Sequence, residues 1–195
     1  MASDDRRWLK RSVTTMLVPA FRQMGFASLP LKGAIGAAQS VRSHMVFGEL
    51  RRAGADGDEL VQLELVPKQR AALRITFGIV PAAGIETITG RLPADEVLAC
   101  WLPLYYQLCP NPRRMWHFLI ARPPGKNIDQ GAYDDMVRAI VSILPQVDVA
   151  LRSGECQANV RMVDLRPGRD RARGIVKLVR WMRQLLPASA PESSR

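Results

Sequence analysis

The clearest hydrophobic pattern along the chain is strict alternation, and it lies between residues 43 and 80. A period of two is typical of half-buried β-strands. We predict three strands here: residues 43–52, a stretch centred on Leu63, and a stretch that runs to Val80. Residues 53–58 (AGADGD) and 67–70 should form the turns between them, because glycine, aspartate and proline favour reversals.

A helical pattern precedes these strands. Apolar residues recur at near-helical spacing over residues 5–23, which predicts an amphipathic opening helix. Pro19 should kink or end this helix, because proline lacks a backbone donor and clashes with the preceding turn. Gly25 is a suitable C-terminal cap. Residues 27–39 are small and contain Pro30, which predicts a loop.

Further elements follow the third strand. Residues 85–90 predict a short fourth strand. A helix should start at Pro93, bend at Pro103 and end before residue 112, since Pro is favoured at the first helical position. Residues 114–121 alternate with both faces apolar, as in a central strand.

The last third of the chain alternates helix and strand. Asn127 and Gln130 resemble a capping box for a helix that Pro145 interrupts. Residues 156–162 predict a last strand, and residues 169–186 a final helix.

This order of elements predicts an α+β fold with a mostly antiparallel sheet of about five strands. N-terminal, middle and C-terminal helices should pack on that sheet. We expect a single domain over residues 1–186 and a disordered C-terminal tail over residues 187–195, which is small, polar and proline-containing.

The overall composition excludes several classes of protein. A chain of 195 residues with 47% hydrophobic residues can bury a core without disulfides. The uncharged stretch 97–112 is too short to span a bilayer and is broken by prolines, and the N-terminus has no apolar signal region. We therefore expect a cytoplasmic protein. Its three cysteines follow no metal-ligand spacing, so we expect buried, reduced thiols and predict no metal and no cofactor.

Net charge is the one anomaly of the composition. The formal charge is +10, and most basic residues are arginine. A GC-rich genome would favour arginine and leave a solvated surface without a partner; alternatively, the charge favours nucleic acid, an acidic protein or an anionic membrane. Residues 166–183 hold much of it, with Asp170 as their only acid.

The final helix is the first candidate site. Arg169, Arg173, Lys177 and Arg180 share one face at spacings of four, four and three, opposite an apolar face. Such a stripe could track phosphates of nucleic acid or meet lipid headgroups. The alternative, which we favour from the sequence, is a helix that packs on the sheet with a solvated charged face.

The second candidate is the loop of residues 122–127 (RPPGKN). Backbone amides at a helix start, together with Arg122, Lys126 and Asn127, could hold an anion. A phosphate-binding P-loop would need glycine in place of Ile120 and serine or threonine in place of Asn127, so that motif is absent. A capped helix after a proline turn is the simpler interpretation.

Catalytic groups are sparse in the sequence. Both histidines, His44 and His117, fall in predicted strands, and no carboxylate is placed to complete an acid–base or metal site with them. We expect hydrogen-bonded core histidines, and a binding protein more than an enzyme.

One segment carries a family resemblance. Residues 19–26 (PAFRQMGF), followed by a variable loop and a β-meander, resemble the start of uncharacterised bacterial α+β domain families, some of them immunity-protein-like. The resemblance implies a non-enzymatic protein-interaction domain that binds a protein partner or itself. A nucleic-acid or polyanion binder that uses residues 169–186 is the alternative.

Overall fold

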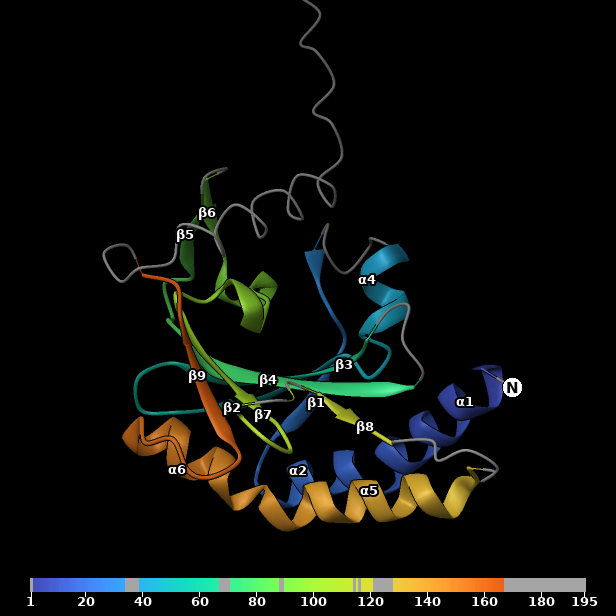
Figure 1. Cartoon of the computed structure of the whole chain (residues 1–195). Coiled ribbons are helices and arrows are strands. Elements are labelled where there is room, and N and C mark those ends of the chain that lie inside the picture. Colours follow the sequence, from blue (N-terminus) through green and yellow to red (C-terminus); the bar gives the residue numbers. More distant parts are fainter. Residues whose placement is uncertain are drawn as a thin grey trace, which may run out of the picture.

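The chain folds around a seven-stranded antiparallel sheet with helices packed on it, an α+β fold as predicted (Figure 1). The structure is a computed structural model that describes residues 2–33, 39–66, 71–87, 90–113, 115, 117–120 and 128–166. Strand order is β1-β2-β3-β4-β7-β9, with β8 paired to one end of β4. The strands are β1 Ala27–Leu29, β2 Glu49–Ala53, β3 Asp58–Leu65, β4 Ala72–Val80, β7 Leu104–Leu108, β8 Phe118–Leu119 and β9 Val160–Asp164.

The predicted opening helix is a rod of three joined segments: α1 Ala2–Ser12, the π-helical turn η1 Val13–Leu17, and α2 Val18–Gln23. Its buried side chains recur at every fourth residue, and all are at most 3% exposed: Asp5, Leu9, Val13, Leu17 and Phe21. A repeat of four drifts by about 40° per step around an α-helix of 3.6 residues per turn. The wider π turn inserts an extra residue and returns the later positions to the core.

Pro19 does not end this rod, which was one of the two effects predicted for it. The N–H of Val18 bonds the carbonyl of Val13, five residues back, and Pro19 falls in the first turn of α2. A proline in a first turn costs little, because its missing donor has no α-helical partner there. The rod ends at Gly25, which has a φ of 90° and caps the helix as predicted.

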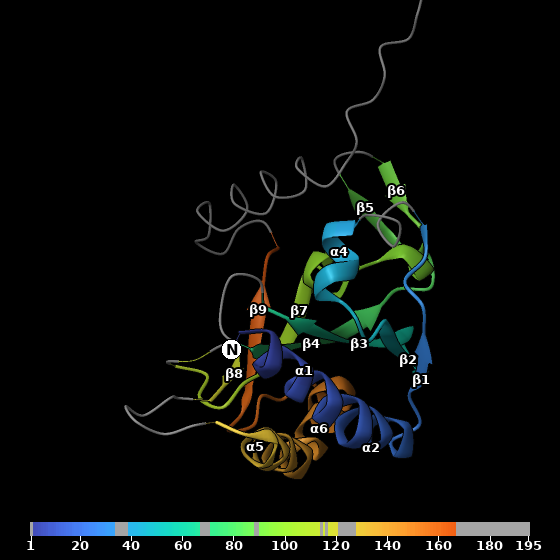
Figure 2. The same cartoon turned by 90° about the vertical axis from the view of Figure 1, so that its right-hand side faces the viewer.

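One face of the sheet packs on four helices. Beneath β3, β4 and β7 lie α1, α2, α5 Gln130–Ile143 and α6 Pro145–Ser153 (Figures 1 and 2). The core between them includes Leu63, Ile75 and Phe77 of the sheet and Val137 and Ile140 of α5, each at most 1% exposed. N-terminal and middle helices therefore cover the sheet as predicted. The predicted final helix, the tail and the turn 67–70 lie outside the described residues.

The opposite face carries smaller elements. These are α4 Gln39–His44, the hairpin β5 Ile85–Thr87 and β6 Gly90–Leu92, and two 3-10 turns, Ala94–Glu96 and Ala99–Trp101 (Figure 2). A second apolar cluster joins the 3-10 turns to the sheet and includes Leu60, Val80, Val97 and Leu102. The short strand predicted at residues 85–90 thus exists, as half of a separate hairpin.

The strand predicted for residues 43–52 is wrong in its first half. His44 ends α4, and the chain then turns through Gly48, whose φ is 69°. A Cβ at Gly48 would collide with the carbonyl oxygen of Leu29. Glycine alone fits this close approach, so the chain turns at Gly48 and the strand begins at the next residue, Glu49.

The helix predicted from Pro93 is also wrong. Val97, Leu98 and Leu102 have extended backbones, so only single 3-10 turns form, and residues 104–108 join the sheet as β7. Proline disfavours helical angles in the residue before it, and here Pro103 follows Leu102. β7 then lies between β4 and β9, the central place expected for residues 114–121.

Three smaller boundaries differ from prediction. Within residues 114–121, the described strand is only Phe118–Leu119, paired with β4. The last strand starts at Val160, since Ala158 and Asn159 form a turn just before it. The N-cap of α5 is Asp129 in place of the predicted Asn127, and its Oδ1 accepts from the amide of Ala132 at 3.1 Å. The helix is interrupted at Pro145 as predicted, since α5 ends at Ile143 and Pro145 starts α6.

Candidate functional site

A row of polar side chains crosses the sheet face that carries α4 and the 3-10 turns. Strand register pairs Glu49 with Gln62, Gln62 with Thr76, Thr76 with Gln107, and Gln107 with Arg161. Directly opposite residues in an antiparallel sheet share a face, so these five lie in one line. In the sequence they alternate with apolar residues, which indicates a solvated face, yet Glu49, Gln62 and Thr76 are at most 5% exposed.

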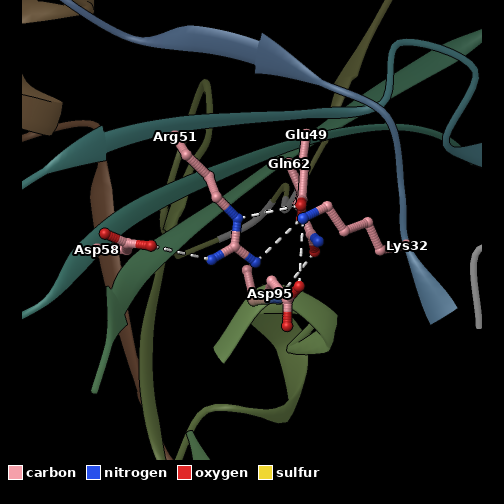
Figure 3. A network of polar contacts seen from close by, with 7 residues as sticks. Lys32, Glu49, Arg51, Asp58, Gln62 and Asp95 are labelled. Atoms are coloured by element: carbon pink, nitrogen blue, oxygen red, sulfur yellow. Dashed lines mark hydrogen bonds and ion pairs between the residues drawn. The ribbon is translucent and has the colours of Figure 1, made fainter. Parts of the chain in front are cut away.

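A buried ion pair lies at one end of this row (Figure 3). Arg51 donates from Nε to Oε1 of Glu49 at 3.0 Å and from Nη2 to Oε2 at 3.3 Å. Its Nη1 reaches Asp58 Oδ2 at 3.5 Å. Glu49 and Arg51 are only 3% and 6% exposed, so the pair lies out of water.

Neighbouring segments are attached to this pair. Burial raises the pKa of Glu49, while the hydrogen bonds and charge of Arg51 oppose that rise. Gln62 accepts from the amide of Ala99 at 2.8 Å, which fastens the second 3-10 turn to the sheet. Lys32 and Asp95 pair at 3.2 Å beside the network. Each charged side chain of this network lies beside a side chain of opposite charge, so we assign the network a structural role.

Two of the three thiols are poor nucleophiles. Burial raises the pKa of Cys100 to about 12 and that of Cys109 to about 11, so both are protonated at neutral pH. Cys156 is exposed and Cys100 is partly exposed, so the prediction of three buried thiols is wrong for both. All three thiols are free.

Neither histidine lies inside a strand, contrary to prediction. His44 ends α4, and His117 precedes β8. Burial and the charge of Arg74 lower the pKa of His117. Arg74 itself donates to Glu64 at 3.0 Å. Within the described ranges, no group of three or more His, Cys, Asp or Glu side chains is placed to hold a metal ion.

The outer side of α1 is a basic surface. Arg6, Arg7, Lys10 and Arg11 are all exposed, and Asp4 forms an ion pair with Arg7 at 3.1 Å. We name this surface the α1 basic face. The helical spacing in the sequence predicts that these cations face solvent, but it does not predict what holds α1 in place.

Hydrogen bonds between α1 and α5 hold α1 in place. Ser12, fully buried, donates to Asp134 at 2.7 Å, and the Gln130 amide donates to Ser12 at 2.8 Å and to the carbonyl of Trp8 at 3.3 Å. Hydrogen bonds from Ser12 and Gln130 lower the pKa of Asp134. Gln130, predicted as part of a capping box, thus joins two helices.

Neither set of predicted site residues lies within the described part of the chain. These residues are Arg169, Arg173, Lys177 and Arg180 of the predicted final helix, and Arg122, Lys126 and Asn127 of the loop before α5. Both candidate sites therefore stay predictions from the sequence.

Comparison of the chain with protein-family models, with curated proteins and with solved structures gives no match in any of the three. Among the described residues, no helix is both long and apolar enough to cross a membrane. The function has to be inferred from the chain's own chemistry.

Proposed function

We propose that this chain is a non-enzymatic binding module whose partner is an acidic polymer, with nucleic acid as the first candidate. The basic residues 166–183 would supply the main contacts. The observation that carries the proposal is the distribution of ion pairs in the described part of the chain.

Most acidic side chains of the folded body are already engaged with its own arginines and lysines. Buried examples are Glu49 with Arg51 and Glu59 with Arg52. Several exposed cations are paired in the same way, as Lys32–Asp95, Arg91–Glu86, Arg138–Asp135, Arg152–Asp148 and Arg166–Asp164 show. Few carboxylates remain to neutralise residues 169–183, which contain Asp170 as their only acid. An external polyanion fits this excess charge.

Salt dependence of binding tests the proposal. Fluorescence anisotropy with labelled random-sequence DNA and RNA should give an affinity that falls steeply as salt rises, because each neutralised phosphate releases counterions. The variant Arg173→Ala/Lys177→Ala/Arg180→Ala should bind more weakly and with a shallower salt slope. Salt-independent binding, or none, would overturn the proposal.

A protein partner or a second copy of the chain is the second candidate. Large apolar side chains are exposed near the sheet edges: Leu29 on β1 and Met162 on β9 at 38%, Leu119 on β8 at 36%, and Met115 before β8 at 41%. Light scattering after size exclusion tests self-association. A dimer that Met162→Lys converts to monomer supports this candidate, and a strict monomer counts against homo-oligomerisation.

Three lesser proposals accompany this one. Free thiols suit a reducing compartment, which supports a bacterial cytoplasmic protein. The loop of residues 122–127 stays a proposed anion site. The resemblance of residues 19–26 to immunity-protein-like families supports a binding role over catalysis.

A further inference from the structure

We propose that the α1 basic face is a docking surface for the phosphate backbone of duplex nucleic acid, separate from residues 166–183. The inference rests on the proposed function and adds a second surface to it, one that lies within the described residues.

The face consists of two parallel rows of hydrogen-bond donors. Arg6, Lys10 and Thr14 form one row, and all three are exposed. Arg7 and Arg11 form the other and are equally exposed, while the hydroxyl of Thr15 in the next turn donates to the carbonyl of Arg11 at 2.9 Å. Neighbours within a row are four residues apart, or about 6 Å along the helix axis.

The four cations lie on the regular α-helix α1, so the second cation of each row is offset from the first by about 40° around the helix axis. All four remain exposed, whereas Leu9 and Val13 of the same rod are buried.

The hydrogen-bond donors of this face suit a partner whose groups only accept hydrogen bonds. Arginine and lysine donate hydrogen bonds and accept none, and phosphate oxygens only accept. Within the described part of the chain, no ion pair joins a carboxylate to Lys10, and the charge of Arg11 contributes to the lowered pKa of Asp134, after the hydrogen bonds from Ser12 and Gln130. By contrast, Arg91, Arg138 and Arg152 each form an ion pair. Like charges at positions i and i+4, such as Arg7 and Arg11, destabilise a helix, and cations near its N-terminus oppose the helix dipole. A bound phosphate backbone relieves both.

The rigid attachment of α1 to α5 favours a rigid duplex over a flexible single strand as the partner. Ser12 and Gln130 tie α1 to α5, so the rows form a preorganised surface. Single-strand binding relies on stacking of bases on exposed aromatic rings. The aromatic residue of this helix, Trp8, is half-buried and packs on Tyr133 with ring centroids 6.2 Å apart. Backbone contact without base reading therefore fits best.

The test uses the full chain and a labelled DNA duplex of random sequence, titrated at several salt concentrations. Replacing Arg6, Lys10 and Arg11 with alanine should weaken binding and flatten the log–log salt slope by up to about three, roughly 0.9 for each lost phosphate contact. A charge-matched control, Arg91→Ala/Arg138→Ala/Arg152→Ala, should leave the slope nearly unchanged. Circular dichroism establishes that both variants keep the fold.

The outcomes separate this inference from the proposed function. If the Arg173→Ala/Lys177→Ala/Arg180→Ala variant loses binding while the α1 variant binds like the unaltered chain, the α1 surface is wrong and the proposed function stands. If the unaltered chain binds no nucleic acid, both are wrong. Equal binding to polyglutamate and to duplex, or tighter binding to single strands, would overturn the assignment to a duplex backbone.

Discussion

The guanidinium of Arg52 lies over the ring of Phe26, 4.4 Å from the ring centroid to Cζ, and joins four parts of the chain. From β2 it donates to Glu59 on β3 at 2.6 Å, to Asp148 on α6 at 2.7 Å, and to the carbonyl of Met24 at 2.5 Å. Its side chain is only 16% exposed.

Removing this guanidinium should destabilise the protein strongly. Arg52→Met leaves the carboxylate of Glu59 buried without its partner, and breaking a buried pair costs about 3–5 kcal/mol. Urea denaturation measures the change in unfolding free energy. The control Arg152→Met removes a cation that is 71% exposed and should cost less than about 1 kcal/mol. Similar losses in both variants would contradict the role of Arg52.

Gly48 should tolerate no side chain. Gly48→Ala combines a φ of 69° with a Cβ that collides with the Leu29 carbonyl oxygen, so the backbone must shift. We expect a loss of about 2 kcal/mol or more. Gly90 is the matched control, because its φ of 114° is also positive but a Cβ added there would have no atom within 4 Å. Gly48→Ala should therefore lower the melting temperature more than Gly90→Ala.

The Glu49–Arg51 pair predicts a pH-dependent defect. Burial already raises the pKa of Glu49, and Arg51→Met removes the charge and hydrogen bonds that oppose the rise. A carboxyl whose folded pKa exceeds its unfolded value, near 4.3, favours folding when protonated, and that stability is lost as pH rises through the folded pKa.

Arg51→Met should thus destabilise the protein more at pH 7 than at pH 4, by about 3 kcal/mol at the higher pH. Chemical denaturation at both pH values measures this. The double variant Glu49→Gln/Arg51→Met should recover much of the loss at pH 7, because no buried charge remains. A loss of the same size at both pH values would show that packing, and not the carboxylate, is responsible.

Thiol reactivity should separate the three cysteines. Burial raises the pKa of Cys100 to about 12 and of Cys109 to about 11, so little thiolate is present near neutral pH, while Cys156 is exposed. Iodoacetamide treatment of the native protein, followed by peptide mass spectrometry, should find Cys156 modified first. All three should react in denaturant. Early modification of Cys100 would mean that its segment opens readily.

The sequence predicts the scaffold better than its connections. β3 and β4 follow from alternation, and the turn before β3 follows from AGADGD, since local patterns determine both. By contrast, β7 has apolar spacing that suits a helix, and only the open edges of β4 and β9 make it a strand. Tertiary pairing overrides local preference there.

For polar side chains, too, the sequence predicts some features and misses others. The exposure of Lys10 and Arg11 is visible from helical spacing. The burial of Glu49 and Gln62 is not, because alternation places them on a face that appears polar until the 3-10 turns cover it. Contacts such as Gln130 with Ser12 join residues more than a hundred positions apart and have no local signature.

The π turn between α1 and α2 lets the opening rod carry one residue more than a regular α-helix whose two ends face the same core. Deleting one residue from Val13–Leu17 would restore a regular α-helix in which Phe21 still faces the core, whereas inserting a further residue would rotate Phe21 by about 100° away from it. Natural variants of this rod should therefore lose one residue here more readily than they gain one.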